Sequence, residues 1–276
     1  MTRRLDFSDH RRELGLNRYI YAVVSRRAQG LSIGVNLNPD KVCNFDCPYC
    51  QVDRTVPGGD GKVDLERLET ELVHLLDLLA SGHLWDTPPF DTAAPDVRRV
   101  ADIAFAGDGE PTSPAKFAAS TEIIRRLRDE RAPGVPIRLL TNSTLLHRPN
   151  VRKALPAIDE IWCKLDAGTP EYFAEVDGTT FPFERILKNL RDLARERAIV
   201  IQSMFLTISG KPASDHEILA WVGLLRELAR HGTISSVQVY TVARAPADKK
   251  IGILPTERLR WIAAQAQAAG LPALVI

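Results

Sequence analysis

The chain alternates short apolar runs with helix-like segments, and this alternation constrains its fold more than any other feature. Strands are predicted at residues 32–37, 102–106, 136–141, 160–165, 198–205 and 236–242, with a seventh candidate at 273–276. Most of these runs are almost continuously apolar, which is typical of strands buried on both faces. Strands that alternate with helices predict a parallel sheet with crossover helices.

Two architectures satisfy this pattern: an open doubly wound sheet and an incomplete β/α barrel. In both, the functional residues follow the carboxyl ends of the strands. We expect one core domain over residues 32–276, preceded by an N-terminal extension over residues 1–31. The extension is rich in arginine, and it is either a solvated flank or a contact surface for an anionic cofactor or substrate. Its arginines are Arg3, Arg4, Arg11, Arg12, Arg18, Arg26 and Arg27.

Composition narrows the class of protein. The chain carries 36 Lys+Arg and 35 Asp+Glu, a net charge of +1, which argues against a protein that coats nucleic acid. No stretch approaches the roughly 18 apolar residues of a membrane span, so no membrane association is predicted. The first residues, Met1-Thr2-Arg3-Arg4, are unlike a signal peptide, and we expect a cytoplasmic protein.

Three of the four cysteines fall within eight residues, directly after the first predicted strand. They are Cys43, Cys47 and Cys50, while Cys163 lies far along the chain. A structural zinc site needs four ligands, a redox pair of Cys47 and Cys50 leaves Cys43 unexplained, and an electron-transfer ferredoxin needs a fourth cysteine. The best fit is a [4Fe–4S] cluster held at three corners, with its fourth iron open to an external ligand.

The spacing Cys-x3-Cys-x2-Cys, with Tyr49 before the last cysteine, resembles the cluster loop of the radical S-adenosylmethionine (radical SAM) superfamily. The resemblance implies an α/β fold, an incomplete TIM-type barrel of six βα units with parallel strands. It implies S-adenosylmethionine bound at the open iron. One electron from the cluster then yields methionine and a 5′-deoxyadenosyl radical, which abstracts hydrogen from a substrate in an oxidoreductase or lyase reaction. A flavodoxin or ferredoxin is implied as the electron donor.

Further residues are matched to cofactor-binding positions by this resemblance. The segment Gly107-Asp108-Gly109-Glu110 is similar to the superfamily's motif of two glycines and a glutamate, which binds the amino group of the cofactor, with Asp108 in place of the first glycine. Asn142 follows the third predicted strand, as in the Thr-Asn-Gly ending common in the superfamily. Tyr49, Asp108, Gly109, Glu110 and Asn142 are therefore candidate cofactor-binding residues.

Lys164 and Asp166 end the fourth predicted strand. Because they are two residues apart, they share one face, and Cys163 packs on the other. We expect the pair to contact the ribose or carboxylate of the cofactor; the alternative is a buried ion pair without a catalytic role. Gln202 and Tyr240 lie in the strands that face the adenosine in the resembling enzymes, so they are also cofactor-binding candidates.

Across most of the chain the resemblance is strongest to the wyosine-base synthase-like branch. It is carried by Ser25-Arg26-Arg27, Gly34-Val35-Asn36-Leu37, the cysteine loop with Gln51, Gly109-Glu110-Pro111-Thr112 and Leu165-Asp166-Ala167. The true synthase has cysteines upstream of the loop and a lysine for pyruvate, whereas here no cysteine precedes Cys43 and no lysine precedes Lys41. This departure argues against the wyosine reaction itself. We expect the substrate to be a small molecule or nucleotide, because the chain is compact and nearly neutral. The alternatives are a tRNA-modifying enzyme, a glycyl-radical enzyme activase and a non-enzymatic iron–sulfur protein.

Overall fold

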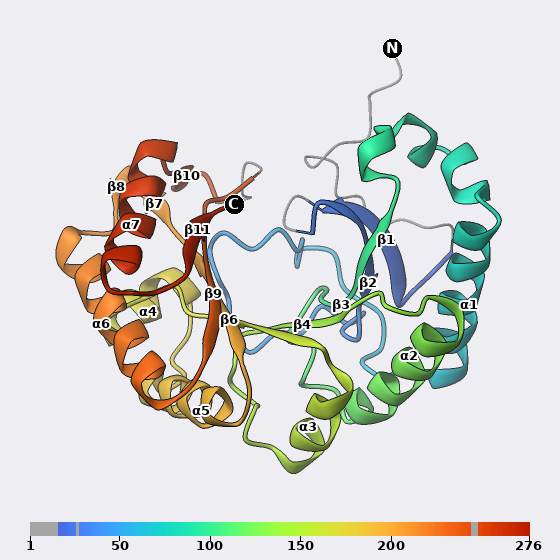
Figure 1. The fold of residues 1–276 in the computed structure, drawn as a ribbon, viewed down its shortest axis with the longest axis horizontal. Coiled ribbons are helices and arrows are strands. Elements are labelled where there is room, and N and C mark those ends of the chain that lie inside the picture. Colours follow the sequence, from blue (N-terminus) through green and yellow to red (C-terminus); the bar gives the residue numbers. More distant parts are fainter. Residues whose placement is uncertain (1–15, 26–27, 244–247) are drawn as a thin grey trace. The chain divides into compact units, whose positions relative to one another are not determined.

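The computed structural model describes residues 16–25, 28–243 and 248–276, which fall into two compact units (Figure 1). The arginines of the predicted extension, apart from Arg18, lie outside the described residues. Unit 1 consists of Met1–Val42, Pro57–Leu140 and Arg148–Asp159. Unit 2 consists of Cys43–Val56, Thr141–His147 and Glu160–Ile276.

Unit 1 is built around four neighbouring strands in the order β1-β2-β3-β4. The first strand pairs antiparallel with β2, and the other pairings are parallel. The elements of this unit are β1 (Ile20–Ser25), β2 (Gly30–Val35), α1 (Leu65–Ala80), η1 (His83–Asp86), η2 (Phe90–Thr92), η3 (Pro95–Val97), β3 (Val100–Phe105), α2 (Phe117–Arg131), β4 (Ile137–Thr141), α3 (Pro149–Ala154) and η4 (Leu155–Ala157).

Unit 2 contains four neighbouring strands in the order β5-β6-β9-β11, and their pairings are all parallel. Helices α5, α6 and α7 lie along one face of these strands (Figure 1). A small antiparallel sheet has the order β10-β7-β8. The elements are β5 (Glu160–Lys164), α4 (Pro170–Asp177), α5 (Phe183–Glu196), β6 (Ile199–Met204), β7 (Leu206–Ile208), β8 (Lys211–Pro212), α6 (Asp215–His231), β9 (Ile234–Tyr240), β10 (Ile251–Ile253), α7 (Thr256–Ala268) and β11 (Ala273–Val275).

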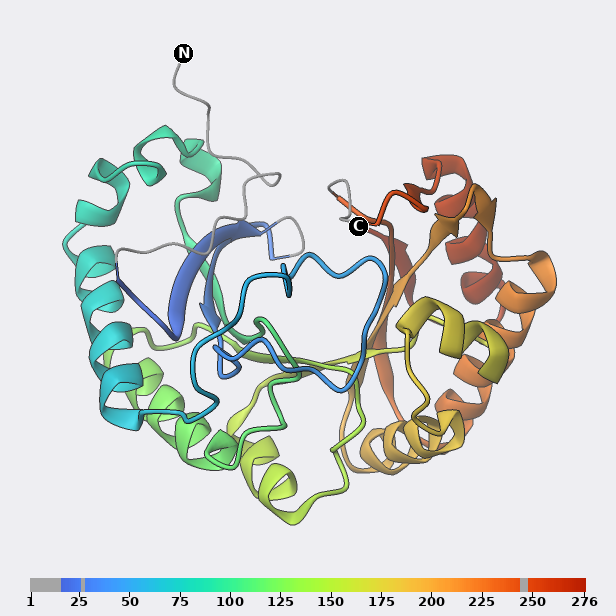
Figure 2. The same ribbon diagram turned by 180° about the vertical axis from the view of Figure 1, so that it is seen from behind.

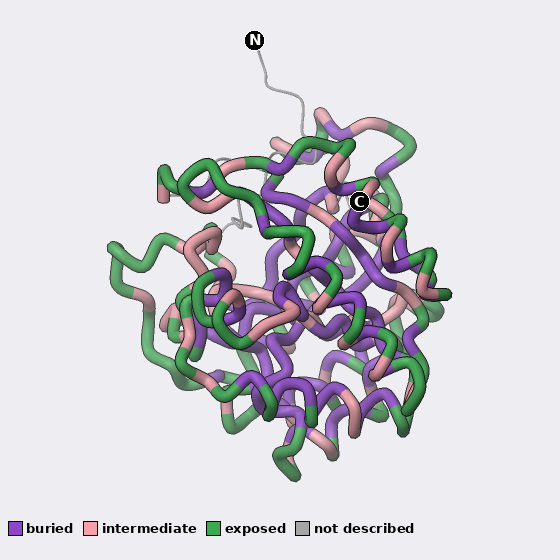
Figure 3. The backbone as a smooth tube through the Cα atoms, turned by 90° about the vertical axis from the view of Figure 1, so that its left-hand side faces the viewer, coloured by how far each residue is buried: buried purple, intermediate pink, exposed green. Residues whose placement is uncertain are grey.

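Each of the seven predicted strands is present, with its ends shifted by one or two residues; they are β2, β3, β4, β5, β6, β9 and β11. Most residues of these strands are buried, as their apolar composition predicts; Figure 3 colours the buried parts of the backbone purple. The sequence interpretation missed β1, which lies within the predicted extension. It also missed the short strands β7, β8 and β10.

Side-chain hydroxyl groups cap two helices of unit 2. Thr169 and Ser214 cap α4 and α6 by accepting backbone N–H bonds. In unit 1, Ser113 does not cap α2, which begins at Phe117. The Ser113 hydroxyl instead donates to the backbone carbonyl of Glu110, 2.8 Å away, and thereby stabilises the turn that carries Glu110. Among the described helices, none combines the length and apolar character that crossing a membrane requires.

Candidate functional site

The cysteine loop of unit 2 belongs to the long irregular segment that joins β2 to α1 (Figure 2). The backbone N–H of Cys50 donates to the carbonyl of Cys47, which closes a turn around the last two cysteines. The N–H of Asp46 donates to the carbonyl of Gly178, just after α4. Gly178 has φ +55°, and a Cβ there would collide with the Asp46 carbonyl, so this close approach requires glycine.

A ring of side-chain hydrogen bonds fixes the start of the same loop. Asn142 Nδ2 donates to Asn44 Oδ1 at 2.7 Å, Asn44 Nδ2 donates to Thr144 Oγ1 at 2.8 Å, and Thr144 Oγ1 donates to Asn142 Oδ1 at 2.7 Å. Asn189 of α5 donates its side-chain N–H groups to the backbone carbonyls of Ser143 and Thr144. The structure therefore places Asn142 against the residue that follows Cys43, where it orients the cysteine loop.

All four cysteines lie in the described part of the chain, and none forms a disulfide. Cys50 Sγ accepts a hydrogen bond from Arg54 Nη1 at 3.3 Å, and Cys47 Sγ lies 3.8 Å from Asp177 Oδ1. Burial raises the pKa of the Cys47 thiol to about 12, although nearby Lys164 opposes the shift. Cys163 is fully buried in β5, as the strand parity predicts.

The donor set of the loop fits an iron–sulfur cluster in its chemistry. Within residues 16–25, 28–243 and 248–276, no group of three or more Cys, His, Asp or Glu side chains is gathered closely enough to hold a metal ion. Three half-buried thiols on a loop of eight residues are nevertheless the soft ligands that iron–sulfur clusters use.

A buried charge cluster lies beside Cys47. The ammonium group of Lys164, at the end of β5, pairs with Asp166 and with Asp177 of α4. Tyr49 contacts both Lys164 and Asp166 through its hydroxyl group, and Lys164 Nζ lies 4.8 Å from the centre of the Tyr49 ring. Asp166 Oδ1 also accepts the backbone N–H of Met204 at 2.8 Å. The predicted residues Tyr49, Lys164 and Asp166 are thus brought together.

Burial and the neighbouring charges together set the pKa values in this charge cluster. Burial acts to lower the pKa of Lys164, but Asp166 and Asp177 outweigh it and raise that pKa well above its ordinary value. Burial also raises the pKa of Asp177 to about 7, against the opposing effect of Lys164. Asp177 was missed by the sequence interpretation, because the last residue of a helix that ends in glycine carries no motif. With both carboxylates ionised, the cluster has one net negative charge and can attract a cationic group.

Two more predicted residues come from neighbouring strands of unit 2. Gln202 is buried in β6, and its Nε2 donates to Oε1 of Gln238 in β9 at 2.7 Å. Tyr240 ends β9 and contributes to the raised pKa of both Lys164 and Tyr49. Tyr240 is therefore near the charge cluster, whereas the amide of Gln202 bridges two strands.

The glycine–glutamate segment follows β3 in unit 1. Glu110 is 3% exposed, and its Oε1 accepts both the hydroxyl and the backbone N–H of Thr112, at 2.5 and 3.2 Å. A Cβ at Gly109 would collide with the Val42 carbonyl and the Asn38 side chain, so glycine is required there. Asp108 Oδ2 accepts from Asn36 Nδ2 at 2.8 Å, which joins the segments that follow β2 and β3. This bond gives the aspartate at the family's glycine position a structural role.

Residues 37–225 match the Radical SAM superfamily, more than half of the chain. The chain therefore belongs to the radical SAM superfamily. Among proteins of similar sequence is the UPF0026 protein MJ1312 of Methanocaldococcus jannaschii, 26% identical over 157 residues, or 57% of this chain and 43% of that protein. A UPF0026 protein of Helicobacter pylori is 27% identical over 245 residues, 87% of this chain and 71% of that protein.

Solved structures with a similar fold include a radical SAM methyltransferase from Sphaerobacter thermophilus. Its TM-score is 0.65 at 16% identity, covering 93% of this chain and 68% of that chain. The structure of TYW1 with a lysine-pyruvate adduct bound gives a TM-score of 0.62 at 14% identity, covering 92% and 85%. These similarities confirm the predicted fold class, an incomplete α/β barrel with mostly parallel strands; the antiparallel β1 is the departure from it.

Proposed function

We propose that the chain holds a [4Fe–4S] cluster on Cys43, Cys47 and Cys50, with one iron left open for S-adenosylmethionine. A flavodoxin or ferredoxin supplies one electron; the sulfonium carbon–sulfur bond then breaks to give methionine and a 5′-deoxyadenosyl radical. The radical abstracts hydrogen from a small-molecule or nucleotide substrate. The observation that carries the proposal is the set of three cysteines on one anchored loop, in a chain that belongs to the radical SAM superfamily.

The chain's own residues orient the cofactor and the loop in this proposal. Glu110, buried after β3, holds the ammonium group of the cofactor, because a carboxylate is the natural partner for a cation. Lys164, Asp166 and Asp177 form a charge cluster whose two carboxyl groups share one ammonium group, so its acceptors suit a positive sulfonium. Asn142 acts through Asn44 and is a positioning residue for the loop.

Anaerobic reconstitution with iron and sulfide tests the cluster. We expect about four irons per chain and a charge-transfer absorption band. When the cluster is reduced in the presence of S-adenosylmethionine, we expect release of 5′-deoxyadenosine. Cys43→Ala, Cys47→Ala and Cys50→Ala should each lose the cluster. Cys163→Ala is the matched control, because that thiol is buried in β5, and it should keep the cluster. Loss of the cluster in Cys163→Ala would indicate ligation by four cysteines and contradict the open iron.

The salt dependence of binding distinguishes a tRNA substrate from a mononucleotide substrate. Binding of tRNA neutralises many phosphates and weakens steeply with salt, whereas a mononucleotide shows a shallow dependence. We expect no steep dependence, because the chain is nearly neutral overall.

A further inference from the structure

Unit 1 contains a cavity of about 410 Å³ that the proposed cofactor chemistry leaves unassigned. It lies where β1 begins opposite the end of β2, since Ile20 pairs with Val35. Asn36 follows β2 directly and Asp108 follows β3, so the cavity is at the carboxyl ends of these parallel strands, the functional end of such sheets. Its polar lining is contributed by Asn17, Arg18, Tyr21, Asn36, Arg67 and Asp108.

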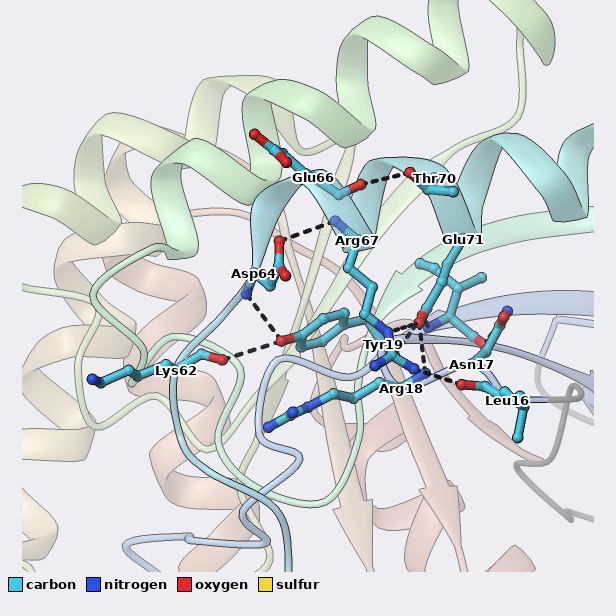
Figure 4. Close-up of polar contacts among 11 residues, drawn as sticks. Leu16, Asn17, Arg18, Tyr19, Lys62, Asp64, Glu66, Arg67, Thr70 and Glu71 are labelled. Carbon is cyan, nitrogen blue, oxygen red and sulfur yellow. Dashed lines mark hydrogen bonds and ion pairs between the residues drawn. The ribbon is translucent and has the colours of Figure 1, made fainter.

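The wall of the cavity is held by one buried carboxylate. Glu71 of α1 accepts the backbone N–H groups of Arg18, Tyr19 and Ile20, at 2.8, 2.7 and 3.1 Å, and also Nε of Arg67 at 2.7 Å (Figure 4). The negative charge of Glu71 is therefore shared among four donors. The wall is pre-organised, and this carboxylate has little capacity left to neutralise a further cation.

Both arginines keep N–H donors beyond those that the structure uses. Arg18 Nη2 binds Asp60, but the Arg18 Nε is buried and has no hydrogen-bond partner among the described residues. Arg67 uses Nε for Glu71 and Nη2 for the carbonyl of Leu16. Because the buried Nε is closed off from water, the donors left for a ligand in the cavity are the Nη1 groups of the two arginines. Asp60 is 68% exposed in its side chain, so its pairing with Arg18 is weakened by solvent.

We propose that this cavity binds the oxyanion group, a carboxylate or phosphate, of a small polar ligand. Arg18 and Arg67 hold the oxyanion, because planar guanidinium groups match the geometry of both. Asp108 accepts a hydrogen bond from an amine or hydroxyl group of the same molecule. The inference rests on the proposed function only in making this ligand the enzyme's substrate; binding itself is tested separately.

Calorimetric titration of the purified full chain tests the binding, with inorganic phosphate and malonate as probes. We expect saturable binding of at least one probe. Arg18→Gln should weaken it about tenfold or more, because the guanidinium group and its positive charge are lost. Arg126→Gln is the matched control, since it removes one positive charge and two surface ion pairs, with Glu69 and Glu130, from the same unit. Asp108→Asn should strengthen binding of both probes by removing a negative charge from the lining.

The outcomes distinguish a phosphorylated ligand from a carboxylate ligand, and they test the cavity independently of the radical chemistry. Preference for phosphate indicates a phosphorylated ligand, and preference for malonate indicates a carboxylate. Absence of saturable binding, or equal losses in Arg18→Gln and Arg126→Gln, would overturn the cavity assignment. If Arg18→Gln is unstable in a thermal melt, Arg18→Lys replaces it; lysine keeps the charge without the planar set of guanidinium donors and should still bind more weakly. Release of 5′-deoxyadenosine without oxyanion binding would support the radical chemistry and contradict the oxyanion site. Oxyanion binding without release of 5′-deoxyadenosine would support the oxyanion site and contradict the radical chemistry.

Discussion

Lys164 Nζ lies 2.5 Å from Oδ1 of Asp177, and the same ammonium group also pairs with Asp166. One lysine thus serves two carboxylates that are each almost completely buried. Buried charges are costly to desolvate, and the ammonium group of Lys164 offsets that cost for both carboxylates. The same charges surround the thiol of Cys47, so the cluster links the fold of unit 2 to its candidate metal ligands.

Removing the lysine should destabilise the protein. Lys164→Met leaves two buried carboxylates without their cation, at a cost of about 3–5 kcal/mol in the free energy of unfolding. Lys188→Met is the control, because Lys188 is 68% exposed in its side chain and its i,i+4 pair with Asp192 contributes little. Urea denaturation measures the difference.

Two substitutions in the charge cluster, Lys164→Met and Asp166→Asn, test whether these charged residues also bind the cofactor. A Lys164→Met protein with lowered stability but normal 5′-deoxyadenosine release per folded molecule would leave the cluster a purely structural ion pair. Asp166→Asn, which keeps an acceptor for the backbone N–H of Met204, should release less 5′-deoxyadenosine if Asp166 contacts the cofactor.

Stability at acid pH should depend on Asp159. Burial acts to raise the pKa of this carboxyl, but hydrogen bonds from the Ile137 backbone N–H and Arg128 outweigh it and lower the pKa below the ordinary 3.8. A lowered pKa means that the stabilisation is present above the unfolded-state value and is lost as pH falls through the folded-state value. The effect should stay below about 1 kcal/mol, because the side chain is 44% exposed.

Thermal melts between about pH 5 and pH 3 check this prediction. The wild-type melting temperature should fall more steeply toward low pH than that of Asp159→Asn. Asp86→Asn removes an exposed carboxylate from the same unit and should follow the wild-type curve. Parallel curves for wild type and Asp159→Asn would show that the two hydrogen bonds do not stabilise the folded state.

Periodicity and composition could predict the parallel strands, because a strand buried on both faces consists of a run of apolar residues. The run at 199–204 therefore appears as β6 within one residue of its predicted ends. β1 was missed because its neighbours in the sequence are arginines and because nothing local specifies an antiparallel partner. Its pairing with β2 is a non-local contact that only the folded chain shows.

The candidate site was predictable where residues follow strand ends, and unpredictable where they come from elsewhere. Lys164 and Asp166 could be paired from their spacing, since side chains two apart share a face. Asp177 and Glu71 could not, because each is an acidic residue in an ordinary amphipathic helix whose partners lie far away in the sequence. Helical spacing marks their neighbours as core residues and gives no reason to bury a carboxylate among them.

Affinity for S-adenosylmethionine should depend on Glu110. Glu110→Gln keeps an oxygen that can accept from Thr112, so the turn should survive, but the negative charge opposite the cofactor's ammonium group is lost. A charge-assisted hydrogen bond contributes roughly 1.5–3 kcal/mol, and binding should weaken about tenfold or more. Equilibrium dialysis of the reconstituted enzyme measures the affinity, with iron content as a check on the cluster.

Glu122→Gln is the matched control for this measurement. Glu122 belongs to the same unit, is 65% exposed in its side chain and pairs only loosely with Lys153, so its loss should leave cofactor affinity unchanged. Equal affinities for Glu110→Gln and Glu122→Gln would remove Glu110 from the cofactor site and leave it as a structural acceptor for Thr112.

The reduction potential of the cluster should depend on Arg54. Its Nη1 donates to Cys50 Sγ at 3.3 Å, and a cationic donor to a cluster sulfur stabilises the more negative, reduced state. Arg54→Gln should therefore lower the potential by tens of millivolts, since about 60 mV corresponds to 1.4 kcal/mol for a one-electron couple. Arg54→Lys retains the charge without the planar donor and should fall between the two. Arg185→Gln, an exposed arginine of the same unit, should leave the potential unchanged. A redox titration followed by electron paramagnetic resonance measures all four proteins, and equal potentials would show that the Arg54–Cys50 contact does not persist in the loaded enzyme.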